Sequence, residues 1–289
     1  MIRYNIKNGQ PVVEQIDSRP FIYFDNWMIN LLLRAKELHD QFILILQQNN
    51  GTLLISDILI TEIAQRSDAK QIERIGNFID HINVAFIESN AHEVISREKE
   101  LEKHHIPISE AKPWSGTKLL EMLETYAHNN FEEFKISELI YLLNQNIINN
   151  NIPEEKLEEE LFPIIKQCRN DPEKLSIAKN RYRNRKNRIR EKYPFTLDIY
   201  TQFVDYIVIQ ESMKMPDSEW RDTMQLVVPV AYCDYVVIDS RWKNFIAQSH
   251  LGYPDIAMVY SNKQIDDFLK DFQNYCQIRN HFQSHGRFR

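Results

Sequence analysis

The stretch FIYFDNWMINLLLRAKELHDQFILIL, residues 21–46, decides how this chain folds. Its first four residues are apolar and Asp25 follows them, a pattern typical of a buried strand that stops at a polar residue. The residues after Asp25 place apolar side chains at helical spacing. The stretch therefore predicts a strand, a turn and a helix.

The same alternation continues along the chain. Further short apolar runs predict buried strands at residues 53–55, 84–87, 235–238 and 256–260. Helical spacing predicts helices between and after these runs, at residues 57–80, from 91 onward, at 220–233 and at 264–278. Ser56 and Asp57 are both suited to cap the helix that carries Glu62 on its second turn. Strands that alternate with helices indicate an α/β fold with a parallel sheet.

The strand pattern is missing in the middle of the chain. From Arg97 to Tyr200 the sequence is rich in Glu, Lys, Asn and Arg, with Leu and Ile at helical spacing. We therefore expect a first part of the α/β core at residues 1–96, a helical insertion at 97–200, and a second part of the core at 201–289.

Composition sets the broad class. The chain has 289 residues, of which 43% are hydrophobic and 26% charged, so it can bury a large core. No apolar run approaches the roughly 18 residues of a membrane span, and the first residues lack the apolar stretch of a signal peptide. The three cysteines are far apart and form no CxxC motif. We expect a cytoplasmic protein with reduced cysteines and no membrane partner.

Four acidic residues stand where a predicted strand gives way to a loop, or on the helix just beyond: Asp25, Glu62, Asp222 and Asp239. In an open parallel sheet, ligands bind outside the carboxyl ends of the strands. Several carboxylates meeting there would repel one another unless a cation neutralised them, and Mg²⁺ or Mn²⁺ suits oxygen ligands. Singly, each acid is better explained as a turn, capping or surface residue. Their order along the chain favours one shared site.

Three segments resemble the PIN-domain nucleases, a family of metal-dependent enzymes that mostly cut RNA. The segments are FIYFD at 21–25, ISDILITEIA at 55–64 and RDTMQLVVPVAYCDYVVIDSRW at 221–242. The resemblance covers roughly residues 21–95 and 220–269, and it implies a PIN-like three-layer fold with a central parallel sheet, interrupted here by a large all-helical insertion. Compact members of the family have far less chain between the glutamate and the third acid.

The resemblance also implies roles for the four acids. Asp25 and Asp239 would be ligands of Mg²⁺ or Mn²⁺. Glu62 would be a ligand or would orient the attacking water, and Asp222 would be a second ligand or an outer acid. The implied activity is a metal-dependent endoribonuclease that hydrolyses RNA phosphodiesters, in a toxin, RNA-decay or defence role.

Other functions stay open at this point. One is a non-catalytic PIN-like scaffold that binds RNA or a protein, and another is a structure-selective DNA nuclease. Single-stranded DNA as a substrate, a homodimer and an inhibitory protein partner are also compatible with the resemblance.

A basic segment, residues 179–192, stands out in a chain whose net charge is -6. It holds eight Lys or Arg residues and a single acid. Such a local patch favours contact with phosphates, and the alternative is a solvated helix paired with the glutamates of residues 154–160. The predicted nucleic-acid-binding residues are Lys179, Arg181, Arg183, Arg185, Lys186, Arg188 and Arg190.

Overall fold

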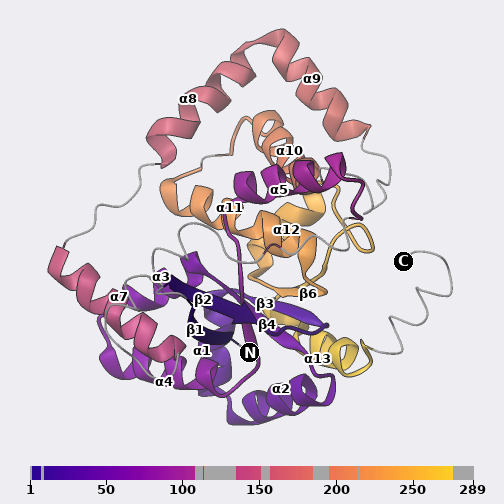
Figure 1. Ribbon diagram of the computed structural model, residues 1–289. Helices are drawn as coiled ribbons and strands as arrows, with labels where there is room; N and C mark the ends of the chain where they lie inside the picture. Colours follow the sequence, from indigo (N-terminus) through magenta and orange to yellow (C-terminus); the bar gives the residue numbers. More distant parts are fainter. Residues whose placement is uncertain are drawn as a thin grey trace.

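A parallel sheet of five short strands forms the centre of the protein (Figure 1). The computed structural model describes residues 2–7, 10–107, 113, 135–150, 157–184, 195–213 and 215–275. The strands lie in the order β5 (Val84–Ile87), β4 (Thr52–Ser56), β3 (Phe21–Phe24), β6 (Tyr235–Val237) and β7 (Met258–Tyr260). The predicted α/β class with a parallel sheet is confirmed.

Alternation of side chains along β3 explains why both faces of the sheet are covered. Ile22 and Phe24 point into one hydrophobic core, while Phe21 and Tyr23 point into another. All four side chains are buried, as expected for a central strand of a parallel sheet. Two helical layers are needed to cover these faces, and the arrangement is consistent with a three-layer α/β fold.

The helices divide between the two faces. The core that contains Ile22 is covered by α1 (Asn26–Arg34), α2 (Lys36–Gln48), α3 (Asp57–Ala64), α4 (Ala69–Asp80), α7 (Ile136–Asn150) and α13 (Ile265–Gln273). The core that contains Tyr23 is covered by α5 (Ala91–Lys103), α10 (Phe195–Ile209), α11 (Asp217–Tyr232) and α12 (Ser240–Gln248). A short 3₁₀ helix, η2 (Asn262–Gln264), precedes α13.

The described part of residues 97–200 is helical, as predicted, and its helices contribute to both cores. Helices α8 (Leu157–Asn170) and α9 (Pro172–Arg183) form an arch above α10 (Figure 1), and each adds a buried side chain, Ile165 and Ala178, to the core shared with α10. Helix α7 packs on α4 instead. Helix α10 runs across residue 200, the predicted end of the helical stretch.

No structure was predicted for the residues before 21, and two strands lie there. Strands β1 (Ile2–Lys7) and β2 (Gln10–Gln15) form a separate antiparallel pair in which Ile2 faces Gln15. The sequence between them is Asn-Gly, a strong hairpin signal. Within the described segments, no helix is both long enough and apolar enough to cross a membrane.

Candidate functional site

The candidate site lies where the strand order reverses. After β3 the chain continues into β4 and β5 on one side, whereas β6 and β7 lie on the other side of β3. Such a switch point leaves a crevice at the carboxyl ends of the two central strands, where ligands of open α/β sheets bind. Asp25 follows β3 directly, and its backbone N–H donates to the carbonyl of Val237 in β6 at 3.0 Å. Asp239 comes two residues after the end of β6.

Two of the four acids are fixed as N-caps of helices. The Oδ1 atom of Asp25 accepts a hydrogen bond from the backbone N–H of Asn26 at 2.6 Å, at the start of α1. The Oδ1 atom of Asp239 accepts from the backbone N–H groups of Arg241 and Trp242 at 2.7 and 3.0 Å, at the start of α12. Aspartate is favoured at this position because it satisfies N–H groups that lack a partner within the helix.

The other two acids project from helices that follow or precede the central strands. Glu62 lies on the second turn of α3, as predicted, and accepts a hydrogen bond from the side chain of Asn26. Asp222 lies on α11, where its Oδ2 accepts from the indole Nε1–H of Trp242 at 3.2 Å. Helix α11 was predicted at residues 220–233 and is observed at Asp217–Tyr232, so it begins three residues earlier, directly after Pro216.

The four acids act on one another electrostatically. Burial raises the pKa of Asp25 to about 7, and the charges of Glu62, Asp222 and Asp239 add to this rise. Burial and the charge of Asp222 likewise raise the pKa of Glu62. Burial, together with the charge of Asp239, raises the pKa of Asp222. Acids from both ends of the chain therefore share one electrostatic environment.

Arginine side chains offset part of this negative charge. Arg66 and Arg221 lower the pKa of Glu62, against the larger effect of burial. Arg221 and Arg241 act in the same sense on Asp222. Arg241 also pairs with Glu219, one turn before Asp222 on α11. The net result is still a raised pKa for both acids, so the arginines neutralise the cluster incompletely.

Asp234 lies at the other end of β6, outside this cluster, and has a structural role. Its carboxylate accepts from the backbone N–H of Phe21 at 2.8 Å and pairs with Arg19 at 2.6 Å. These contacts hold the start of β3 beside the start of β6. Asp234 is therefore structural, as its place in front of the strand suggests.

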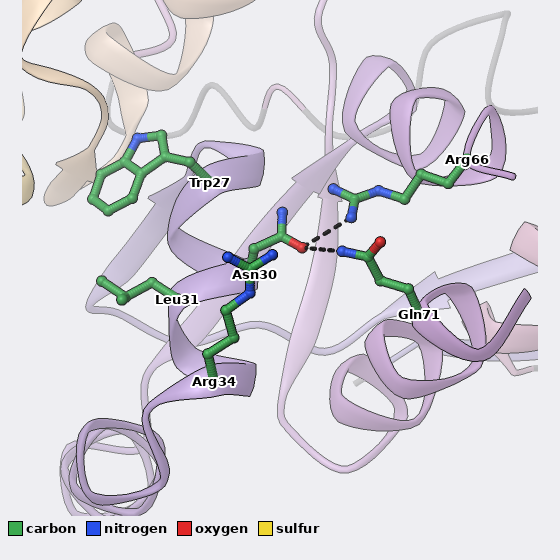
Figure 2. Close-up of a pocket in the computed structure, with 6 residues that line it drawn as sticks. All are labelled: Trp27, Asn30, Leu31, Arg34, Arg66 and Gln71. Atoms are coloured by element: carbon green, nitrogen blue, oxygen red, sulfur yellow. Dashed lines mark hydrogen bonds between the residues drawn. The ribbon is translucent and has the colours of Figure 1, made fainter. Parts of the chain in front are cut away.

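A network of polar side chains that the sequence analysis did not predict joins Glu62 to a neighbouring pocket. Arg66 donates to Oδ1 of Asn26 at 2.6 Å and to Oδ1 of Asn30 at 2.9 Å. Gln71 also donates to Oδ1 of Asn30, at 2.8 Å. Figure 2 shows Arg66 and Gln71 reaching from one side toward Asn30. The pocket, here called the arginine pocket, has a volume of about 430 Å³ and is lined by Trp27, Asn30, Leu31, Arg34, Arg66 and Gln71.

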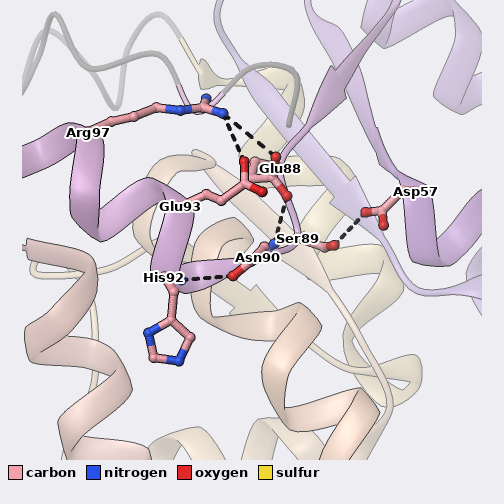
Figure 3. Close-up of polar contacts among 7 residues, drawn as sticks. All are labelled: Asp57, Glu88, Ser89, Asn90, His92, Glu93 and Arg97. Carbon is pink, nitrogen blue, oxygen red and sulfur yellow. Dashed lines mark hydrogen bonds and ion pairs between the residues drawn. The ribbon is translucent and has the colours of Figure 1, made fainter. Parts of the chain in front are cut away.

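A second polar group lies where β5 gives way to α5 (Figure 3). The carboxylate of the buried Glu88 accepts from the backbone N–H of Asn90 at 2.8 Å and lies 3.8 Å from the guanidinium of Arg97. The hydroxyl of Ser89 donates to Asp57 at the start of α3. These contacts join the end of β5 to α3 and α5, so we interpret the group as structural.

The predicted basic segment is described only as far as Asn184, the residue that follows the last turn of α9. Lys179 and Arg183 are exposed there. Arg181 makes a bidentate ion pair with the buried carboxylate of Asp205 on α10, at 2.9 and 2.6 Å. Arg181 therefore has a structural partner. The remaining predicted residues, Arg185, Lys186, Arg188 and Arg190, lie outside the described residues.

No group of three or more His, Cys, Asp or Glu side chains within the described residues is arranged to hold a metal ion as it stands. Comparison of the chain with protein-family models, with curated proteins and with solved structures gives no significant match.

Proposed function

We propose that this chain is a metal-dependent endoribonuclease of PIN-like fold that hydrolyses phosphodiester bonds of cytoplasmic RNA. The observation that supports the proposal is the mutual electrostatic effect of Asp25, Glu62, Asp222 and Asp239 at the switch point of the sheet. Acids with unrelated roles at the surface would not be expected to lie within electrostatic reach of one another at this point, since they come from segments far apart in sequence. In this proposal residues 97–200 are an insertion that shapes access to the site.

The chemistry of the donor set fits a hard divalent cation such as Mg²⁺ or Mn²⁺. All four side chains are carboxylates, the preferred ligands of these ions, and they are only partly buried. Burial and, to a smaller extent, repulsion from the other acids raise the pKa of Asp25, and a bound cation would relieve that repulsion. The bound cation would lower the pKa of a water molecule and neutralise charge that develops on the phosphate. Side-chain adjustment on binding is required, because the unbound acids do not form a ready-made set.

Asp25 and Asp239 are the acids best prepared to hold the cation. Each uses Oδ1 to cap a helix, which fixes the carboxylate, and within the described residues the Oδ2 atom of each accepts no hydrogen bond. Glu62 is held by Asn26 and lies near Arg66, so it can orient the attacking water and accept its proton. Asp222, held by Trp242, adds negative charge beside Asp239.

Cleavage of a fluorescently labelled single-stranded RNA tests the proposal. We expect the wild-type chain to cut it with 5 mM Mn²⁺ or Mg²⁺ and to stop when EDTA is added. Asp25→Asn and Asp239→Asn should each lower the rate by at least about a hundredfold, the scale of losing one electrostatic contact to a reacting group. The matched control is Asp40→Asn on α2, since Asp40 is exposed and outside the cluster.

Full activity in both cluster variants would refute the site, as would cleavage that persists in EDTA. A parallel reaction with single-stranded DNA of the same sequence shows whether the 2′-hydroxyl matters.

The finding that no described acidic group is arranged for a metal favours a second candidate, a non-catalytic scaffold of the same fold that binds RNA or a protein. Titration with Mn²⁺, followed by its paramagnetic effect or by calorimetry, separates the two. A chain that binds RNA but takes up no Mn²⁺ at millimolar concentration would be a scaffold.

A further inference from the structure

The arginine pocket begins within one turn of the acidic site. Its four residues from α1 recur at positions i, i+3, i+4 and i+7 counted from Trp27, so they share one helix face. The buried residues of the same helix, Met28, Ile29 and Leu32, lie in the core, and Trp27 and Leu31 pack against its edge while remaining partly exposed. Because α1 starts directly after Asp25, the pocket lies beside the acids along the helix.

The pocket carries positive charge. Arg34 and Arg66 line it, and none of the six lining residues is acidic. Burial lowers the pKa of Arg66, Glu62 acts against this effect, and the charge of Arg34 adds a smaller lowering, so the two guanidinium groups repel each other. Arg34 is exposed and makes no ion pair within the described part of the chain. An anion between them would relieve the repulsion and could accept charge-assisted hydrogen bonds from both.

The rest of the lining suits a nucleobase. Trp27 and Leu31 give the pocket an aromatic and an aliphatic wall, and Figure 2 shows both on the α1 side, opposite Arg66 and Gln71. Aromatic side chains stack on bases without regard to sequence. A volume of about 430 Å³ lies in the range of sites for small organic ligands.

A direct polar connection couples the pocket to the acidic site. Arg66 lines the pocket and donates to Asn26, whose side chain donates to Glu62. A phosphate held at Arg66 would therefore sit next to the residues that position Glu62.

We infer that the arginine pocket binds one nucleotide of a single-stranded RNA, with its phosphate at Arg34 and Arg66 and its base against Trp27. This inference rests on the proposed function, because the bound nucleotide would lie next to the phosphodiester bond that a water molecule would attack at the site of the four acids.

Binding is measured in EDTA, so that affinity does not depend on cleavage. The probe is a fluorescein-labelled ten-nucleotide single-stranded RNA followed by fluorescence anisotropy over a range of salt concentrations, with inorganic polyphosphate as the competitor. The variants are Arg34→Gln, which removes an exposed side chain without an ion pair, and Trp27→Leu. The control is Lys99→Gln, because Lys99 is also exposed but lies on α5, across the sheet. Thermal unfolding confirms that each variant is folded.

We expect Arg34→Gln to weaken RNA binding about fivefold near 0.1 M salt and to reduce the salt slope by about 0.7, as for loss of one phosphate contact. It should weaken polyphosphate binding as well. Trp27→Leu should weaken RNA binding by about fivefold or more and leave polyphosphate binding unchanged.

The inference is overturned if Arg34→Gln binds RNA like wild type and Lys99→Gln, or if the wild-type chain shows no saturable binding. A chain that binds RNA through the pocket but never cuts it would refute the proposed nuclease activity and leave the pocket standing.

Discussion

Replacing Asp25 by asparagine should stabilise the chain above neutral pH and leave its stability almost unchanged in acid. Asparagine has the same shape and is an equally good N-cap, so its Oδ1 can keep the hydrogen bond from the N–H of Asn26 at the start of α1. What the substitution removes is the negative charge of a carboxylate that burial and three other acids disfavour.

The magnitude follows from the pKa of Asp25. Burial raises this pKa from the ordinary value of 3.8 to about 7. At 1.36 kcal/mol for each pH unit, the difference corresponds to about 4 kcal/mol. The unfolded chain loses its proton near pH 4 and the folded chain near pH 7, so the wild type loses stability as pH rises through this window. Neighbouring acids can take up protons in its place, so we expect the variant to gain about 2 kcal/mol at pH 8.

The assay is thermal and urea unfolding of both chains in EDTA, at pH 5 and at pH 8. A gain of about 2 kcal/mol should raise the midpoint temperature by roughly 5 °C at pH 8, with little difference at pH 5. Adding Mn²⁺ at pH 8 should raise the wild-type midpoint more than that of the variant. Asp40→Asn serves as the control, since Asp40 is exposed and its pKa is lowered by His39 and Lys36, so loss of its charge should not stabilise the chain at pH 8. A variant that is less stable than wild type at pH 8, or equally different at both pH values, would show that burial and the neighbouring acids do not raise the pKa of Asp25.

Two further predictions concern the helical stretch and how it is packed. Arg181→Gln should destabilise the chain by about 2 kcal/mol, because it leaves the buried carboxylate of Asp205 without its partner. Lys179→Gln, the control, should have no measurable effect on stability. Equal urea midpoints for the two variants would contradict a structural role for Arg181. Gly76→Ala should lower the free energy of unfolding by about 1–3 kcal/mol. A Cβ atom at this position would lie 2.7 Å from Cβ of Ser137 and would push α7 away from α4. An unchanged midpoint in thermal unfolding would show that these helices do not pack closely.

The sheet could be predicted from sequence because its strands are buried on both faces. Short apolar runs such as residues 21–24 and 84–87 have no other plausible environment, and each is bounded by polar or turn residues. The boundaries were less certain where burial is weaker. The last strand was predicted at residues 256–260 and is observed at Met258–Tyr260, where two of the three residues are only partly buried.

The four acids could be proposed from sequence because each follows a feature that is visible locally, the end of a strand or a helix next to one. Their partners could not be. Arg66 lies after α3 and Asn30 lies within α1, and nothing in the local sequence relates the two residues. Arg181 illustrates the same limit, because its place in a basic run predicted an exposed role while its partner, Asp205, lies 24 residues further along the chain.

Helix α1 connects these observations physically. Its core face accounts for Met28, Ile29 and Leu32, and its N-terminus accounts for Asp25 as a cap. Trp27 and Leu31 pack against the edge of the same core, but packing and capping do not account for Arg34, which lies beside Arg66 in a pocket without an acid in its lining. Repulsion between the two arginines lowers the stability of the folded chain, and so does repulsion among the four acids near Asn26. The acidic cluster and the arginine pocket are adjacent sites of opposite charge, and each destabilises the folded chain when it is empty. An RNA bound together with a divalent cation would neutralise both, with the cation at the acids and a phosphate at the arginines.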